Sequence, residues 1–448
     1  MGSGAALEAN FDRLEQWLPK LADAKSVLLQ RKAVEGRVAF VTTRDVRAGE
    51  VVLQIPGDVA VTAADAAGNE DIGELTTGRS PLVCMALWLM AEQSRDASSS
   101  WYPLLQTLPE STLSPLLWSE NELKWLSESE VLQQTKSRVA ALRQEWEALS
   151  EVISRNPKRF PPDIFGEQEF RKAFSVVLAC STYLPSAQCF ALLPVVSALA
   201  RTGHESGCTV DYNADLDAVV VTASKSYRGG EEVSLYYDQP NGERLLALGS
   251  LEEQNPSDFL SIDVELVPSD GLFRAKKQIL EGLGLQAKQS FPIYEDKMPA
   301  QLLSYLRLSR VQDAAQLAKV RFDEDAAVSQ MNEYEVLQLL MGECRTRLAA
   351  YDTTIEEDVK ALQKSDMDPK QRLATQLILG EKNVWQGTMT AVRSRLAPIR
   401  GIPTKNGLSD PNEDILELFS TIESLPNKPK QMLDGFVSWA KGEQGSKK

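Results

Sequence analysis

Hydrophobic and polar residues alternate with a period of two in two parts of the chain that lie far apart in the sequence. The first part, residues 38–55, predicts two strands around a polar turn. The second part predicts three more strands, at residues 209–212, 218–223 and 232–237. Between the two parts, residues 80–149 carry apolar side chains at helical spacing. We therefore predict a helical insertion between β segments that fold together, at about residues 35–60 and 190–250.

The sequence after about residue 262 changes to a helical period that continues to about residue 397. Amphipathic runs predict helices at residues 333–351, 354–364 and 371–395. Thr353 or Thr354 is suited to cap the second of these helices through its hydroxyl group. The tail from Pro398 holds one weaker helical run, residues 413–422, and we expect it to be loosely held.

The predicted fold class is therefore α+β, with a small β-rich domain that contains a helical insertion, followed by an all-helical C-terminal domain. We assign residues 1–29 to an N-terminal helical segment and 30–260 to the β-rich domain, with the insertion at about 80–165. The helical domain takes residues 261–397, and the tail takes 398–448. A chain of 448 residues is long enough for two or three domains.

Composition narrows the class of partner. Apolar residues make up 43% and charged residues 25%, the usual balance of a soluble folded protein. The formal net charge of −15 repels phosphate backbones and anionic membranes, so we expect a protein partner and no nucleic acid. No apolar run reaches the length of a membrane-spanning helix, so we expect no membrane insertion.

Cysteine and histidine usage argues against several kinds of site. The five cysteines are odd in number and form no C-x-x-C pair, which argues against a zinc site and a disulfide framework. His204 is the only histidine, so a metal centre or a histidine-based triad would depend on it alone. We expect no metal, and we expect His204 to be a solvent-facing loop residue.

Five motifs occur in an order that resembles one known family. The insertion carries W-Y-P-L-L-Q-T-L-P at residues 101–109 and W-S-E-N-E-L at 118–123, and the helical part carries L-L-S-Y-L-R-L at 302–308, Y-D-T-T-I-E-E-D at 351–358 and G-E-K at 380–382. Taken singly, each could be an ordinary helix surface. Their joint order and spacing resemble the SET-domain proteins of the Rubisco large-subunit lysine N-methyltransferase (Rubisco LSMT) type.

The resemblance implies a SET domain followed by a substrate-binding domain. Members of the family transfer a methyl group from S-adenosylmethionine to a lysine ε-amine. Tyr237, in L-Y-Y-D after G-E-E-V, matches the family's catalytic tyrosine. A tyrosine at a strand end is also commonly a packing residue, so both interpretations of Tyr237 stay open.

The positions that match the family's methyl-donor motifs differ from the family pattern. The family's E-G-x-G reads Glu35-Gly36-Arg37-Val38, so a branched valine replaces the second glycine. The family's R-S-R reads L-A-C and ends at Cys180, which leaves this stretch without a charge or a hydroxyl group.

Two further motifs have changed in the same way. In P-x-x-D-x-x-N-H-S, Ser197, Ala200 and Arg201 replace the Asp, Asn and His. In N-x-E-L-L-x-x-Y-G-F, Leu248 and Ser250 replace the two aromatic residues. The resemblance thus implies a vestigial donor site at Glu35, Gly36, Arg37, Ala200 and Arg201, with its space partly filled by side chains.

Two functions follow, and the sequence favours the first. The first is a catalytically impaired protein-binding or assembly factor, for which no cofactor is expected. The second is an active, S-adenosylmethionine-dependent protein-lysine N-methyltransferase in which Arg201 or Arg37 binds the donor carboxylate and Tyr237 is catalytic. The resemblance places either one in the chloroplast stroma, with Rubisco or another stromal protein as partner. The cytosol fits the composition equally well.

Overall fold

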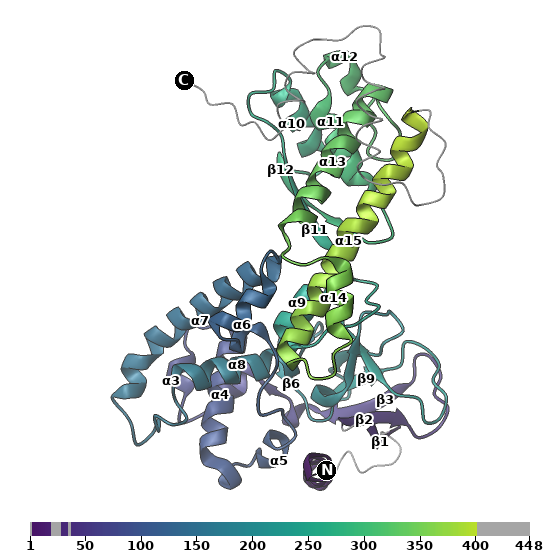
Figure 1. Ribbon diagram of the computed structural model, residues 1–448. Coiled ribbons are helices and arrows are strands. Elements are labelled where there is room, and N and C mark those ends of the chain that lie inside the picture. The colour runs from purple at the N-terminus through teal and green to yellow at the C-terminus, as the bar shows by residue number, and fades with distance from the viewer. Residues whose placement is uncertain (1, 19–27, 35–36, 401–448) are drawn as a thin grey trace. The chain divides into compact units, whose positions relative to one another are not determined.

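The computed structural model describes residues 2–18, 28–34 and 37–400 (Figure 1). The chain divides into two compact units, Met1–Ala391 and Val392–Lys448. The described part of the second unit is the C-terminal end of helix α15. The helix expected at residues 413–422 and most of the tail lie outside the described residues.

The β-rich part consists of short strands in small sheets. In chain order the strands are β1 Leu29–Val34, β2 Arg37–Thr42, β3 Val51–Pro56, β4 Val61–Thr62, β5 Ser181–Leu184, β6 Cys189–Leu192, β7 Ala200–Thr202, β8 Thr209–Asn213, β9 Ala218–Thr222 and β10 Ser234–Tyr236. The sheets have the strand orders β1-β2, β3-β9-β8, β4-β6-β5 and β7-β10. β7 and β10 are parallel, whereas the other pairs are antiparallel.

The expected strands at residues 38–55 are present, but they do not pair with each other. β2 pairs with β1, which the sequence analysis missed, and β3 pairs with β9. The expected hairpin is therefore wrong. The β1 sequence, L-Q-R-K-A-V, has three consecutive polar residues and lacks a period-two pattern, which explains why it gave no strand signal.

Segments from both ends of the β-rich part are hydrogen-bonded to each other. The Val233 N–H donates to the Phe40 carbonyl at 2.9 Å, and an isolated bridge joins Val46 to Tyr227. These bonds, together with the β3-β9 pairing, bring the first β segment and the segment around Tyr237 together across the helical insertion.

Helices fill the sequence between the β segments. They are α2 Ala63–Ala67, α3 Gly73–Thr76, α4 Pro81–Arg95, α5 Tyr102–Leu105, α6 Glu120–Leu123, α7 Glu130–Ser154 and α8 Glu167–Cys180, with α1 Gly2–Trp17 before them. α4 begins where the sequence provides an N-cap, because the Ser80 hydroxyl accepts from the Val83 N–H and Pro81 occupies the first turn.

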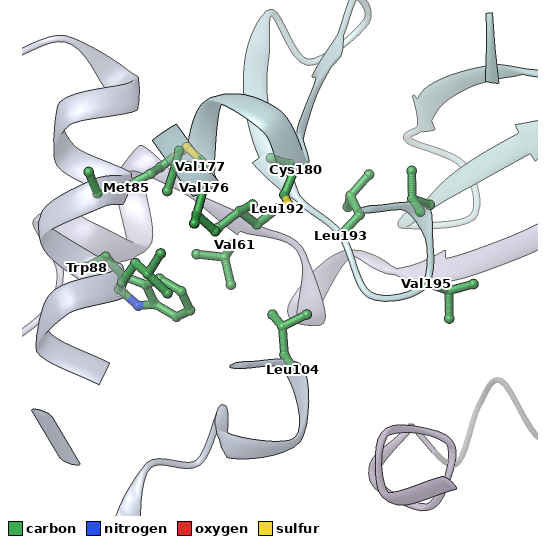
Figure 2. Close-up of a cluster of buried hydrophobic side chains, with 14 of the residues drawn as sticks. Val61, Met85, Trp88, Leu104, Val176, Val177, Cys180, Leu192, Leu193 and Val195 are labelled. Carbon is green, nitrogen blue, oxygen red and sulfur yellow. The ribbon is translucent and has the colours of Figure 1, made fainter. Parts of the chain in front are cut away.

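The main hydrophobic core lies between α4, α8 and the strands that follow them. Figure 2 shows Met85 and Trp88 of α4, Val176 and Val177 of α8 and Leu192 of β6 in one cluster. Leu192 is fully buried, and Trp88 is 2% exposed. Burying side chains of this size stabilises the fold by about 1.5–3 kcal/mol each.

The C-terminal part is mainly helical, as predicted, but it also contains a sheet. α9 Asn241–Leu248 ends the β-rich part, and the helices of the C-terminal part are α10 Phe273–Gly282, α11 Ala300–Arg310, α12 Ala314–Leu317, α13 Gln330–Ala350, α14 Ile355–Leu362 and α15 Pro369–Arg400. Strands β11 Leu260–Glu265 and β12 Lys288–Ile293 form an antiparallel pair. The α+β fold class is confirmed, but the description of this domain as all-helical needs that correction. The two strands were not predicted because each is short and because α10 separates them in the sequence.

The expected cap of the second C-terminal helix is confirmed. The Thr354 hydroxyl accepts from the Glu357 N–H, and the Glu357 carboxylate accepts from the Thr354 N–H, which forms a capping box. Among the described residues, no helix is both long and apolar enough to cross a membrane.

Candidate functional site

The position of Tyr237 is fixed by the pairing of β7 with β10. In this parallel pair Leu235 lies opposite Arg201 and Tyr236 lies opposite Thr202. The pairing extends one residue further, because the Tyr237 N–H donates to the Thr202 carbonyl at 2.8 Å. Arg201 and Tyr237 are thus held on neighbouring strands although they are far apart in the sequence.

A strained turn precedes the segment that carries Arg201. Val195 has φ 67° and ψ −48°, and the Val196 N–H donates to the Pro194 carbonyl at 2.7 Å. This is a γ-turn, which a β-branched residue rarely adopts and which costs on the order of 1–3 kcal/mol. The 6% exposure of Val195 shows that packing holds the turn in place.

Two arginine side chains lie against the Tyr237 ring. The Arg201 Cζ atom is 5.8 Å from the ring centroid, and the Arg244 Cζ atom is 5.6 Å from it. Both distances are within the range of cation–π attraction. Arg244, on α9, is 3% exposed and donates to the Arg201 carbonyl at 2.9 Å. Arg201 is half-buried and donates to the Ser181 carbonyl at 3.3 Å.

Burial shifts the pKa values of this group of residues. It lowers the pKa of Arg201, and the positive charge of Arg244 lowers it further. Burial raises the pKa of Tyr237, although the charge of Arg201 opposes that rise. The phenol is therefore protonated at physiological pH, and both guanidinium groups stay charged because the ordinary pKa of arginine exceeds 12. We call Arg201, Tyr237 and Arg244 the arginine–tyrosine cluster.

Two carboxylates lie beside this cluster. Glu252 contacts Arg244 at 3.3 Å and also accepts from the Thr202 hydroxyl at 2.6 Å. Glu243 binds Arg138 through both oxygens, at 3.0 and 2.9 Å. In residues 2–18, 28–34 and 37–400, no carboxylate forms an ion pair with Arg201.

Cys180, at the end of α8, is 4% exposed and lies in the hydrophobic core (Figure 2). Burial raises the pKa of its thiol to about 11, and Arg201 is close enough to oppose that rise. The thiol is therefore neutral at physiological pH. Cys180 brings neither charge nor a strong hydrogen-bonding group to the cluster.

A second charged region surrounds a cavity of about 180 Å³. Residues of α7, α9 and α15 and of the start of β11 line it, among them Glu130, Asp258 and Glu381. Glu381 is 6% exposed and accepts from the Ser129 hydroxyl at 2.6 Å and from the Tyr351 hydroxyl at 2.9 Å. We call this region the carboxylate cavity.

Burial raises the pKa of Glu381 to about 7, and the charges of Glu130 and Asp258 add to that rise. The hydrogen bonds from Ser129 and Tyr351 oppose it. Burial also raises the pKa of Asp258. Glu381 therefore changes charge near neutral pH, unlike an exposed glutamate.

The motifs at residues 351–358 and 380–382 contact each other at this cavity. Tyr351 donates to Glu381, while the Lys382 ammonium group donates to the Asp358 carboxylate at 2.5 Å. Lys382 is 1% exposed and Asp358 is 4% exposed. The two motifs therefore carry side chains that bind each other across two packed elements.

Comparison with known proteins identifies the family. The family model for Rubisco LSMT substrate-binding matches residues 267–384. A chloroplastic [fructose-bisphosphate aldolase]-lysine N-methyltransferase of Arabidopsis thaliana is 29% identical over 86% of this chain and 83% of that protein. The structure of Rubisco LSMT bound to AdoMet has a TM-score of 0.69 at 25% identity, and the match covers 92% of this chain and 99% of that one.

The chain has the fold of the SET-domain protein Rubisco LSMT and carries the substrate-binding domain of that family at residues 267–384. Other relatives of this SET-domain protein are named for other target proteins. A Rubisco large-subunit N-methyltransferase of Nicotiana tabacum is 28% identical over 82% of the chain and 79% of that protein. A human actin-histidine N-methyltransferase is 26% identical over 76% of the chain and 61% of that protein. The family is therefore one of protein methyltransferases with both lysine and histidine targets.

The structure brings only some of the expected donor-site residues of this SET-domain protein together. Arg201, Tyr237 and Cys180 are neighbours, and Ala200 lies half-buried on β7 next to Arg201. Val38 is 9% exposed on β2 and belongs to the same hydrophobic core as Cys180.

The remaining expected positions add little to the cluster. Glu35 and Gly36 lie outside the described residues, and Arg37 is described only as the first residue of β2. Ser197 and Leu248 are half-buried, and Ser250 is exposed. His204 is exposed in a loop, as expected. Among the described residues, no group of His, Cys, Asp and Glu side chains could hold a metal ion.

Arg244 and the carboxylate cavity were not predicted from the sequence. Arg244 follows Asn241 and Glu243 in a motif whose family pattern has Leu at its position, and that exchange was the available signal. Glu381 was noticed only as part of a family motif. Nothing in the sequence shows that Ser129, more than 200 positions away, donates to it.

Proposed function

We propose that this SET-domain protein binds a protein partner and does not transfer a methyl group. The observation that supports this proposal is the pair of guanidinium groups on the Tyr237 ring, at 5.8 and 5.6 Å. In the family's reaction both reactants carry positive charge, because S-adenosylmethionine is a sulfonium ion and lysine arrives as an ammonium ion. Two arginines beside the tyrosine repel the sulfonium and the lysine ammonium group, whereas the carboxylate of the donor is attracted to Arg201, which is the contact that the second function requires.

The size of this effect is large enough to weaken binding substantially. Two unit charges about 6 Å apart repel by about 3 kcal/mol at an effective dielectric constant of about 20. A change of that size lowers affinity by about a hundredfold. Glu252 and Glu243 offset part of the positive charge, but each already has an arginine partner.

The residues at the donor positions do not fit S-adenosylmethionine. Cys180 is a neutral, buried thiol where the resemblance expects an arginine, and Val38 is a buried branched side chain where it expects a glycine. Ala200 supplies no side-chain hydrogen bond where an Asn is expected. We derive no methyl-transfer step through this group.

The partner we propose is Rubisco or another protein of the chloroplast stroma. Two of the relatives act in the chloroplast, one on Rubisco and one on aldolase. The net charge of −15 favours a partner surface with exposed basic residues. Calorimetry with purified Rubisco in the absence of S-adenosylmethionine measures this binding. Absence of heat at Rubisco concentrations up to about 100 μM would remove Rubisco as the partner.

Calorimetric titration with S-adenosylmethionine tests the central proposal. We expect no binding by the unmodified chain at millimolar ligand. The quadruple variant Val38→Gly, Cys180→Arg, Ala200→Asn, Arg201→His should bind, whereas each single variant should not, because the missing contacts act together. Micromolar binding by the unmodified chain would contradict the proposal.

The second candidate is an active protein-lysine N-methyltransferase, and it is supported by the hydrogen bond from the Tyr237 N–H to the Thr202 carbonyl, which holds this tyrosine just after β10. Turnover of a lysine substrate distinguishes the two candidates. If the unmodified chain methylates a lysine substrate, Tyr237→Phe should abolish that activity. Tyr236→Phe, at an exposed neighbouring position, should retain it. That pattern would establish the enzyme and refute the binding-only function.

A further inference from the structure

We infer that the arginine–tyrosine cluster is a binding site for a carboxylate group, supplied by an acidic side chain of the protein partner. This inference rests on the proposed function, since it names what the partner brings to the site. It is argued from the charges and hydrogen bonds of the cluster alone.

The first step is a count of charges. Three guanidinium groups lie in or beside the cluster, those of Arg138, Arg201 and Arg244. Three carboxylates accompany them: Glu243 pairs with Arg138, Glu252 pairs with Arg244, and Asp258 attracts Arg244 without forming an ion pair. Among the described residues, Arg201 is therefore the one guanidinium group of the three that has no ion-pair partner.

The second step is a count of hydrogen bonds. A guanidinium group has five N–H donors. Arg201 donates to the Ser181 carbonyl at 3.3 Å, which is beyond the usual range for such bonds. The Nε–H of Arg244 is buried and has no acceptor among the described residues. Arg244 is 3% exposed, so water does not readily supply that acceptor.

The third step concerns the ligand class. A charged group that is removed from water without a counter-ion is strongly destabilised. A carboxylate restores the balance, because its two oxygens match the fork of a guanidinium group. Burial destabilises the charged form of Arg201 and so lowers its pKa. A bound anion would offset that destabilisation.

The fourth step concerns access. Arg201 and Tyr237 are half-buried residues, whereas Arg244 is 3% exposed. Glu252 is already held by the Thr202 hydroxyl and the Gly203 N–H, at 2.6 and 2.7 Å. It is therefore not free to move to Arg201. The missing anion must come from outside the described residues.

Thermal unfolding at constant ionic strength tests the site, with sodium acetate replacing sodium chloride. The unmodified chain should show a saturable rise in melting temperature with acetate. A blocked glutamate peptide, N-acetyl-glutamate amide, should give the same rise if an acidic side chain is the ligand. Arg201→Gln should weaken the apparent acetate affinity at least about tenfold. Arg47→Gln, at an exposed turn position, should leave it unchanged.

A second measurement separates ligand binding from a structural role. If Arg201 is a buried cation without a counter-ion, Arg201→Gln should melt at a higher temperature than the unmodified chain in chloride. Arg201→Lys keeps the charge and loses the fork, so it should retain a weaker response to acetate. Lower melting of Arg201→Gln in chloride, with an unchanged acetate response, would show that Arg201 has only a structural role.

Three results would overturn the site. These are no saturable response of the unmodified chain, an equal response of Arg201→Gln, or saturation by phosphate at lower concentration than by acetate. The last result would change the ligand class from carboxylate to phosphate. A response to acetate but not to the blocked peptide would assign the site to a free small carboxylate. Failure here leaves the S-adenosylmethionine titration unaffected, so the two proposals fail separately.

Discussion

Two guanidinium groups lie against the Tyr237 ring, and one of them, that of Arg201, has no ion-pair partner among the described residues, whereas carboxylates and no cations line the cavity at Glu381. Both regions bury charge, but they compensate for it differently. Glu381 is 6% exposed, accepts two hydrogen bonds, and can become neutral near pH 7. Arg201 cannot lose its proton at physiological pH, and it has one long hydrogen bond.

The comparison shows that a buried acid and a buried base are not equivalent. A buried carboxyl group avoids the desolvation penalty by binding a proton, so the stability of a region with excess carboxyl groups depends on pH. A guanidinium group cannot lose its proton at physiological pH, so a buried arginine without an ion-pair partner is stabilised by binding an anion. Substitutions in each region can break or sharpen this contrast.

The largest effect is expected for Arg244→Met in the arginine–tyrosine cluster. The variant removes a buried charge that is paired with Glu252 and bonded to the Arg201 carbonyl. Breaking a buried pair costs about 3–5 kcal/mol, because the remaining charge is left without compensation. Urea unfolding measures the loss. A change below about 1 kcal/mol would show that Arg244 is not part of the stabilising network.

The next largest effect is expected for Glu381→Gln in the carboxylate cavity. The pKa of Glu381 in the folded chain, about 7, is above its ordinary value of 4.5. Protonation therefore contributes stability that is fully present below about pH 4.5 and is lost as the pH rises to about 7. The difference in unfolding free energy between variant and unmodified chain should shift by about 3 kcal/mol between pH 4.5 and pH 8, in favour of the variant at high pH.

The control for this pH effect is Glu147→Gln, an exposed position on α7. The unfolding free energy of that variant should change with pH in the same way as that of the unmodified chain. If Glu381→Gln also follows the unmodified chain, Glu381 titrates as an ordinary carboxyl group and the cavity is not a pH-responsive region.

A smaller effect is expected for Tyr351→Phe. This change removes the hydroxyl group that donates to Glu381 at 2.9 Å. A hydrogen bond to a charged group contributes about 1.5–3 kcal/mol, so the loss should be near 2 kcal/mol at pH 8 and smaller at pH 5, where Glu381 is neutral. Tyr183→Phe, at a position that is 47% exposed, is the control. Equal losses at the two pH values would argue that Tyr351 acts through packing alone.

The smallest effect is expected for Arg138→Met, which breaks the pair between Arg138 and Glu243. The two side chains are 39% and 31% exposed, so water screens the interaction. Pairs of this kind contribute about 0.2–1 kcal/mol. Urea unfolding of this variant beside Arg244→Met compares an exposed and a buried arginine of one region. A loss as large as that of Arg244→Met would show that exposure does not decide the outcome.

Much of the architecture followed from local patterns. Thr354 capped its helix where the sequence placed it, and the runs at 333–351 and 371–395 became helices α13 and α15. Apolar spacing and capping chemistry act over a few residues, so they can be read directly from the sequence. The family motifs added the order of the domains.

Long-range contacts could not be read in the same way. Arg201 and Tyr237 belong to two separate sequence motifs, and the parallel pairing of β7 with β10 brings them together. No sequence pattern indicated that Arg244 would be 3% exposed or that Ser129 would donate to Glu381. The strands β1 and β11 also escaped detection, because a strand of six residues is stabilised by a partner that may come from any part of the chain.

The sequence by itself determined the fold class, the domain type and the residues that stand at the methyl-donor positions. Only the tertiary structure decided how the charges are paired, with the guanidinium group of Arg201 unpaired beside Tyr237 and an excess of carboxylates around Glu381. The physical reason is that the effect of a charge depends on its burial and on its nearest partners. Both are set by packing between segments that the sequence keeps far apart.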